Sequence, residues 1–326
     1  MPLELPEAFP LYERFPALRS LPKASLCTLP SPVERLELPD ASEIWIKRDD
    51  LDATGCGGNK VRSLEFLLGG LKAGDTVVTV GGAGSTHVLS TAIHAASLGI
   101  KVEAMRWTHD MNPVAEIVTQ RVTGMTSRPP GGGAPMALLR AEYRARRRHL
   151  RFIPIGGSTP RGTLGHVNAA LELAAQIERG ELPQPGRVVL PLGSGGTTAG
   201  LLLGFAIAGL PIEVVGVRVG PRPFVNRISV LRRVRQTATL IYQVTGERLP
   251  RVHGARLRVV HGFYGGAYGR PLAEASAPAN ILQTSRGITL DDTYSAKAWV
   301  AAMHEAGQSR SPVLFWLTFD ARCLTN

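Results

Sequence analysis

Short apolar runs alternate with amphipathic segments along most of this chain. The apolar runs are rich in valine, isoleucine and leucine and are bounded by glycine, proline or polar turns, which is typical of buried strands. They lie at residues 75–82, 101–107, 150–157, 186–192, 211–220 and 311–319. Segments with apolar residues at helical spacing come between them, at 86–99, 112–122, 161–180, 196–209 and 291–307. This alternation predicts the α/β fold class, with parallel sheets covered by helices on both faces.

Glycine, proline and asparagine mark where several elements begin or end. Gly99 and Gly180 predict helix ends, and Asn112 before a proline predicts a helix start. The stretch 128–135 is interpreted as a loop, and Pro183–Gly186 as the clearest internal joint. We therefore expect two parallel-sheet α/β domains, with any functional site between them.

The composition narrows the class of protein. Of 326 residues, 44% are hydrophobic, which is typical of a globular chain. No apolar run approaches the roughly 20 residues that a membrane span needs, and the N-terminus lacks the pattern of a secretory signal. The cysteines at 27, 56 and 323 show no metal-ligand spacing and are interpreted as reduced thiols. We expect a cytoplasmic protein with no metal site and no membrane partner.

The formal net charge of +11 depends partly on an arginine cluster between residues 140 and 151. A nucleic-acid patch is one interpretation, and a solvated helix end before a strand is the other. The cluster has few aromatic residues for base stacking, so the helix end is favoured and no nucleic-acid partner is expected. Basic charge would also attract an anionic substrate or cofactor.

A glycine-rich loop between a strand and a helix offers the clearest ligand site. It contains three glycines and three hydroxyl residues, namely Gly193, Ser194, Gly195, Gly196, Thr197 and Thr198. Glycine lets the backbone approach an anion, and the free N–H groups of the helix start would hold a phosphate. The spacing fits neither a nicotinamide fingerprint nor a P-loop. A tight turn without a ligand is the alternative.

Two further glycine turns precede helices. The first places Ser85, Thr86 and His87 at a helix start, which indicates either a second anion site or a simple helix cap. The second covers 156–159 and is interpreted as a capped glycine turn.

Lys60 follows two glycines and an asparagine in the sequence GGNK, where a helix should start. A desolvated lysine loses its proton more easily and becomes nucleophilic. Near a phosphate loop it could form a Schiff base with a carbonyl cofactor. Pyridoxal phosphate combines that aldehyde with a phosphate.

Several segments together resemble one family. They are IKRDDLDATGCGGNKVRSLEFLL, VVTVGGAGSTHVLSTAIHAASLG, IPIGGSTPRGTLGHVNAALEL, LPLGSGGTTAGLLLG, GFYGGAYGRP and LDDTYSAKA. In this order they are similar to the 1-aminocyclopropane-1-carboxylate deaminase and D-cysteine desulfhydrase family. Those proteins are pyridoxal-phosphate enzymes of fold type II, the tryptophan-synthase-β-like group. The resemblance covers about residues 44–297.

The resemblance implies roles for specific residues. Lys60 would bind the cofactor as a Schiff base with support from Asn59, and the loop 193–198 would hold its phosphate. Ser85, Thr86 and His87 would meet the substrate carboxylate and the cofactor ring. Tyr268 and Tyr294 match two active-site tyrosines that are candidates for proton transfer, and Thr318 would meet the pyridine nitrogen.

The resemblance also implies an organisation. Residues 1–62 and 174–326 would form a large cofactor-binding domain, and residues 63–173 a small α/β domain. A homodimer is expected.

Three departures from the family pattern bear on the reaction. Thr86 stands where the family usually has the asparagine that contacts the cofactor's phenolic oxygen, and its side chain is shorter. Phe319 and Asp320 replace two glycines, which would add bulk where backbone passes close to the ring. Ala267 stands in the tyrosine loop where glycine is common.

The expected function is a pyridoxal-phosphate-dependent deaminase or lyase. Its substrate would be a small amino acid, such as D-cysteine or the cyclopropane amino acid. Two alternatives stay open. One is another reaction of the same cofactor, such as racemisation, β-replacement or a biosynthetic step. The other is a protein without catalysis, either a degenerate cofactor-binding relative or a basic binding protein.

Overall fold

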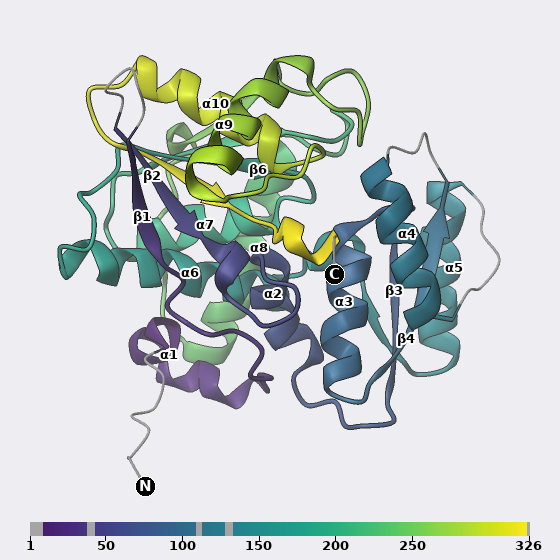
Figure 1. The fold of residues 1–326 in the computed structure, drawn as a ribbon. Coiled ribbons are helices and arrows are strands. Elements are labelled where there is room, and N and C mark those ends of the chain that lie inside the picture. Colours follow the sequence, from purple (N-terminus) through teal and green to yellow (C-terminus); the bar gives the residue numbers. More distant parts are fainter. Residues whose placement is uncertain (1–8, 38–42, 109–112, 128–132, 325–326) are drawn as a thin grey trace, which may run out of the picture.

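The computed structural model describes residues 9–37, 43–108, 113–127 and 133–324. Two sheets organise this part of the chain (Figure 1). The larger sheet has the strand order β1 (Val33–Glu37), β2 (Glu43–Arg48), β9 (Val313–Leu317), β6 (Arg187–Leu192), β7 (Glu213–Arg218) and β8 (Leu257–Val260). The smaller sheet has the order β4 (Lys101–Trp107), β3 (Thr76–Gly82) and β5 (Arg151–Ile153).

All neighbouring strands run parallel except β1 and β2, which pair antiparallel. The described α-helices are α1 (Pro10–Arg14), α2 (Asn59–Leu68), α3 (Thr86–Ser97), α4 (Pro113–Met125), α5 (Ala134–Arg147), α6 (Pro160–Glu178), α7 (Gly196–Ile207), α8 (Arg227–Thr245), α9 (Ser276–Arg286) and α10 (Ser295–Gly307). The predicted α/β class with parallel sheets is confirmed.

Helix α7 shows how the sequence builds the core. Its residues are apolar or small around the whole helix, so the helix is buried from 196 to 205. Gly200 and Gly204 face α6, where an added Cβ would lie 2.3 Å from the Cβ of His166 and 2.4 Å from that of Ala170. The glycines therefore let the backbones of α6 and α7 approach closely. The two helices pack together against one face of the larger sheet.

The connections between elements correct two expectations. Pro183–Gly186 links α6 to β6 within the larger sheet's half of the molecule, so it is not a joint between the sheets. Ala134 and Pro135 open α5 instead of extending the loop, because proline fits the first turn of a helix. Asn112, the predicted cap of α4, and most of the loop 128–135 lie outside the described residues.

The domain limits at 63 and 173 remain a proposal. Helix α6 contributes Leu164, Val167 and Leu173 to the same hydrophobic cluster as β6 and α7. This packing argues for moving the second limit toward residue 158, so that α6 belongs with the larger sheet.

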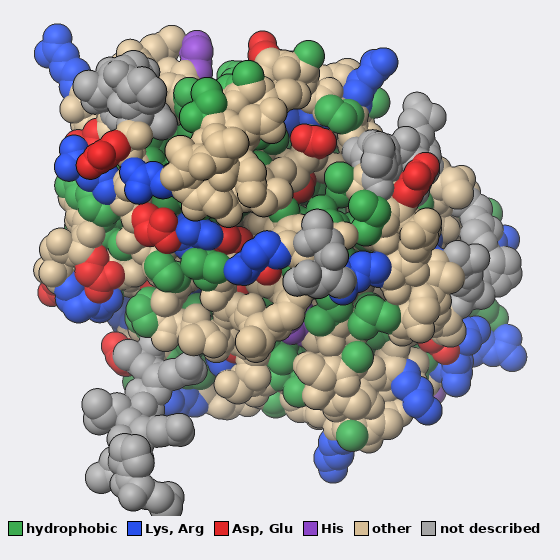
Figure 2. Space-filling model, viewed as in Figure 1, with side chains coloured by type: hydrophobic (Ala, Val, Ile, Leu, Met, Phe, Trp, Pro, Cys, Tyr) green, Lys and Arg blue, Asp and Glu red, His purple; other side chains and the backbone are tan. Residues whose placement is uncertain are grey.

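The arginine cluster lies on α5 and the turn that follows it. Arg144 and Arg148 both pair with Glu103 of β4, as expected for a helix end packed beside a sheet. On the face drawn in Figure 2, acidic side chains stand between many of the basic ones. None of the described helices combines the length and apolar character that a membrane crossing requires.

Two of the three cysteines are paired, which corrects the interpretation of them as reduced thiols. Cys56 and Cys323 form a disulfide with their Cα atoms 5.3 Å apart, and Cys27 is free and buried. Sequence spacing could not reveal this pair because 267 residues separate its members. The pairing removes the thiol-based argument for a reducing compartment.

Reducing the Cys56–Cys323 bond is expected to lower the free energy of unfolding by about 2–4 kcal/mol, because the bond restricts the unfolded chain. Urea unfolding with and without dithiothreitol should show this loss in the native chain. A Cys56→Ser/Cys323→Ser variant should not respond to the reductant. Finding three reactive thiols in the unfolded, unreduced chain would contradict the pairing.

Candidate active site

Lys60 occupies the first turn of α2, directly after a glycine turn. Gly58 precedes the helix with φ 123°, a conformation that only glycine adopts without strain. The Lys60 Nζ donates a hydrogen bond of 3.0 Å to Asn59 Oδ1. Burial lowers the pKa of Lys60 to about 8, and the negative charge of Asp291 partly opposes this shift. The amine is therefore far easier to deprotonate than a surface lysine.

Asn59 connects Lys60 with two other segments. Its Nδ2 donates to Thr197 Oγ1 over 2.8 Å, and its backbone N–H donates to the Thr318 carbonyl over 3.0 Å. Three stretches that were singled out from sequence, around 60, 197 and 318, therefore meet at one point. The contact places the amine beside the start of α7.

The loop 193–198 differs from the other two glycine turns in how its helix begins. Ser85 caps α3 and Thr159 caps α6 with side-chain oxygens, whereas Gly195, at φ 86°, gives α7 no side-chain cap. The buried Thr198 Oγ1 has no hydrogen-bond partner. A helix start without a cap from its own loop, beside an unpaired hydroxyl, fits a bound phosphate.

The turn at 156–159 was interpreted as a capped glycine turn, and Thr159 does cap α6 by accepting from the Gly162 N–H. Its neighbour Ser158 does more. Ser158 Oγ lies 2.7 Å from Ser194 Oγ and accepts the Gly196 N–H over 3.1 Å. Ser158 therefore stabilises the candidate phosphate loop although it lies in a different turn.

The turn at 85–87 brings a neutral histidine close to Lys60. Ser85 Oγ accepts the Val88 N–H over 3.4 Å, which favours the capping role. His87 is buried, and its Nε2 lies 3.2 Å from Thr79 Oγ1. Burial, and next the charge of Lys60, lower the pKa of His87 to about 3. The imidazole is therefore uncharged at neutral pH.

The two candidate tyrosines are in contact. The hydroxyls of Tyr268 and Tyr294 are hydrogen bonded, and the Tyr294 hydroxyl also bonds Thr86. A Cβ added to Gly193 would lie 4.0 Å from the Tyr294 ring, so this ring borders the phosphate loop. Burial raises the pKa of both phenols. Both are therefore protonated at neutral pH and can donate a proton.

The side chains of Phe319 and Asp320 both have partners within the protein. Phe319 packs into an apolar cluster with Cys56, Cys323 and residues of α3. Asp320 pairs with Arg322. Backbone hydrogen bonds hold this segment against the Lys60 turn, while the Phe319 ring lies in the cluster.

Two buried residues near the site were missed from sequence. Lys297 is fully buried and donates from Nζ to the Tyr264 carbonyl over 2.9 Å; burial lowers its pKa to about 8. His166 lies 3.5 Å from Thr197 Oγ1 and has an unpaired Nδ1. A lysine or histidine within an amphipathic helix gives no sign of burial in a single sequence.

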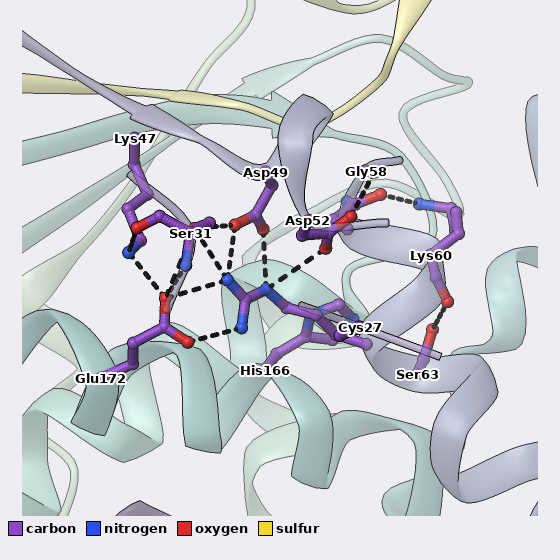
Figure 3. Close-up of polar contacts among 12 residues, drawn as sticks. Cys27, Ser31, Lys47, Asp49, Asp52, Gly58, Lys60, Ser63, His166 and Glu172 are labelled. Carbon is purple, nitrogen blue, oxygen red and sulfur yellow. Dashed lines mark hydrogen bonds and ion pairs between the residues drawn. The ribbon is translucent and has the colours of Figure 1, made fainter. Parts of the chain in front are cut away.

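A buried ion network lies behind Lys60 (Figure 3). Arg62 pairs with Asp49 and Glu172, and Glu172 also pairs with Lys47 over 2.6 Å. The cationic partners lower the pKa of Glu172 to about 2 although its burial acts in the opposite direction. The network joins α2, α6 and β2, so it supports the helix that carries Lys60.

Gly195→Val is expected to weaken pyridoxal phosphate binding by orders of magnitude. Valine would be strained at φ 86° and would disturb the N–H groups of the loop. Losing two or three charge-assisted hydrogen bonds costs about 1.5–3 kcal/mol each. Gly209→Val is the matched control because Gly209 has φ 71°, open space around it, and lies beyond the other end of α7. Equal cofactor affinity in the two folded variants would contradict the assignment.

Comparison with known proteins agrees with this geometry. The family model described as "Pyridoxal-phosphate dependent enzyme" matches residues 24–318. Nocardicin C-9' epimerase from Nocardia uniformis subsp. tsuyamanensis is 34% identical, with 93% of this chain and 94% of the relative covered. D-cysteine desulfhydrase from Salmonella newport is 31% identical, covering 94% and 96%. The crystal structure of an ACC deaminase homologue superposes with a TM-score of 0.77 at 28% identity, covering 95% and 94%.

Proposed function

Because this chain belongs to the family of pyridoxal-phosphate-dependent enzymes, we propose that it deaminates a small amino acid, either by eliminating a β-substituent or by opening a cyclopropane ring. The contact that carries this proposal is the Lys60–Asn59–Thr197 link. It puts a half-buried, easily deprotonated amine next to a helix start that has no cap from its own loop, which are the two features that an aldehyde with a phosphate requires.

The cofactor, when bound, supplies the electron sink for the reaction. Lys60 would hold it covalently and then move a proton at the substrate's α-carbon, or at a ring carbon of the cyclopropane amino acid, whose α-carbon carries no hydrogen. The loop 193–198 would bind the phosphate, braced by Ser158. The Thr318 hydroxyl would meet the ring nitrogen.

The chain's remaining groups would orient the substrate. The helix start at Ser85 and Thr86 offers N–H groups and a hydroxyl to the substrate carboxylate. His87 would line the substrate site with an uncharged ring. The paired phenols of Tyr268 and Tyr294 would supply a proton to a leaving group or to the product.

An absorbance spectrum and an amino-acid panel test this proposal. The purified chain with pyridoxal phosphate should show a visible absorbance band that borohydride removes. D- and L-amino acids, including D-cysteine and the cyclopropane amino acid, should then be assayed for keto acid, ammonia and sulfide. A chain that gains the band but yields no keto acid from any of them would contradict the deaminase proposal.

Epimerisation is the second candidate, favoured by the relative named as an epimerase at 34% identity. Epimerisation inverts the configuration of the substrate's carbon and keeps its amino group, whereas deamination removes the amino group. Chiral chromatography of each amino acid after incubation separates the two. Inversion without keto acid would favour the epimerase.

Tyr294→Phe and Tyr268→Phe are each expected to keep the visible band and to slow turnover by about 10²–10⁴-fold, the usual range for a lost proton donor. Tyr242→Phe is the control, because Tyr242 is 48% exposed on α8. Native turnover in both site variants would make these tyrosines structural. Loss of the band would assign them to cofactor binding instead.

We also propose a cytoplasmic homodimer. The family resemblance supports the dimer. The location stays a prediction from the sequence, because the Cys56–Cys323 disulfide removes its thiol-based support. Sedimentation at micromolar concentration should give twice the chain mass of 34.9 kDa. A monomer under these conditions would reject the dimer.

A further inference from the structure

The helix that carries Lys60 begins without a side-chain cap of its own. Gly58, at its start, has no side chain, and its N–H donates over 2.8 Å to Asp52 Oδ1. Asp52 lies six residues earlier and is fully buried. Its backbone carbonyl also accepts the Thr28 N–H. Asp52 therefore joins the segment at Thr28 to the turn that precedes Lys60.

The two carboxyl oxygens of Asp52 have different surroundings. Oδ1 accepts the Gly58 N–H, whereas the buried Oδ2 has no hydrogen-bond partner. The nearest cation, the Nε of Arg62, lies 3.7 Å from Oδ2 and donates instead to Asp49 over 3.0 Å. Figure 3 shows Asp52 between Asp49 and the Gly58 turn.

The charges around Asp52 are already balanced without it. Arg62 and Lys47 are the buried cations, and each is paired with Asp49 or Glu172. Those two carboxylates also accept other hydrogen bonds, from the Trp316 Nε1–H and the Ser31 N–H. A third negative charge in this fully buried network would have to share Arg62, which lies 3.7 Å away and already pairs with two carboxylates. Such an incompletely compensated charge is costly in a protein interior.

We propose that Asp52 is kept as an uncharged carboxylic acid, and that it acts as a positioning residue which holds the Gly58 N–H and so fixes the start of the Lys60 helix. This proposal rests on the assignment of Lys60 under the proposed function. The acid's proton resides on Oδ2, and its carbonyl oxygen Oδ1 accepts from Gly58.

The groups that face Asp52 agree with a neutral acid. Desolvation by burial, and next the charge of Asp49, raise the pKa of Asp52 well above its ordinary value, while Arg62 and the Gly58 N–H oppose this and Glu172 adds to it. The neighbouring Cys27 thiol is also uncharged, because burial raises its pKa. Both groups therefore stay protonated together.

Three variants distinguish the role of Asp52 as a hydrogen-bond acceptor from a role of its charge. Asp52→Asn keeps an acceptor without a charge, Asp52→Ala removes the acceptor, and Asp49→Asn removes a charge that Arg62 needs. Borohydride trapping of pyridoxal phosphate on Lys60 should proceed at the native rate in Asp52→Asn. It should slow about three- to tenfold in Asp52→Ala, the effect of one lost hydrogen bond. Asp49→Asn should instead raise the unfolding constant about a hundredfold or more.

The pH dependence of unfolding gives a readout that needs no cofactor. A carboxyl that stays protonated in the folded state but ionises in the unfolded state makes unfolding more favourable as pH rises. Above the unfolded-state pKa near 4, the native unfolding constant should therefore rise with pH relative to that of Asp52→Asn, by up to about tenfold per pH unit until the folded-state pKa is reached. Urea unfolding of the full chain at pH 5, 6 and 7 measures this ratio.

Different results overturn different claims. A ratio that does not change with pH, or that falls as pH rises, rejects the uncharged acid. Native trapping rates in Asp52→Ala, or equal losses in Asp52→Asn and Asp52→Ala, reject the positioning role. If the native chain traps no cofactor on Lys60, the proposed function fails and the positioning role fails with it, while the pH ratio still decides the state of Asp52.

Discussion

Lys60→Ala is expected to abolish covalent cofactor attachment and to lower turnover by more than about 10³-fold. Proton transfer by a positioned group alone is worth about 10²–10⁴-fold, and this variant also loses the covalent link. The cofactor should remain bound non-covalently, because the loop 193–198 is unchanged.

Lys297→Met is the matched control for Lys60→Ala. Both lysines are buried enough that their pKa values fall to about 8. Only Lys60 is hydrogen bonded to the side chain that reaches the phosphate loop. Lys297→Met should therefore keep the reducible visible band. A Lys60→Ala protein that keeps this band would transfer the cofactor role to another lysine.

Arg62→Met is expected to lower the free energy of unfolding by about 3–5 kcal/mol, because removing one partner of a buried pair leaves its carboxylates uncompensated. The Arg62 side chain is 1% exposed and pairs with both Asp49 and Glu172. Circular dichroism during urea unfolding provides the measurement.

Arg179→Met is the control for this effect. Arg179 pairs with Glu181 at the end of α6, and its side chain is 52% exposed. Exposed pairs contribute about 0–1 kcal/mol, so this variant should unfold almost like the native chain. Equal losses in Arg62→Met and Arg179→Met would mean that the buried network adds nothing beyond a surface ion pair.

The sequence predicted best what local chemistry determines. Glycine turns between strands and helices appear at 81–85 and 193–196 as expected, because chain direction and helix starts are set by neighbouring residues. The antiparallel pair of β1 and β2 was not predicted, since both strands are short and mix charged with apolar residues. Helix α8, with its many arginines, was also missed.

Several residues that support the site could not be predicted, because their partners lie far away in the sequence. Ser158 meets Ser194 across 36 residues, and Glu172 meets Arg62 across 110. Nothing near Asp52 in the sequence indicates that its carboxyl accepts from the Lys60 turn while Arg62 turns to Asp49. Lys60 and the glycine loops could be identified from their residue types and local sequence. The residues that support them could be identified only from the fold that brings them together.

The lowered pKa of Lys60 also predicts how the covalent attachment of the cofactor depends on pH. Because the neutral amine attacks the aldehyde, the rate of attachment to Lys60 should rise with pH up to about 8 and level off above it. A surface lysine, with a pKa of about 10.4, would keep gaining rate two units higher. Stopped-flow absorbance from pH 6 to pH 11 distinguishes the two profiles.

Peptide mapping after borohydride reduction tests the central claim most directly. The native chain, incubated with one equivalent of pyridoxal phosphate at pH 8, reduced and digested, should carry the pyridoxyl mass on Lys60. Label on Lys297 or another lysine, or no label on a folded chain, would contradict the account of this site.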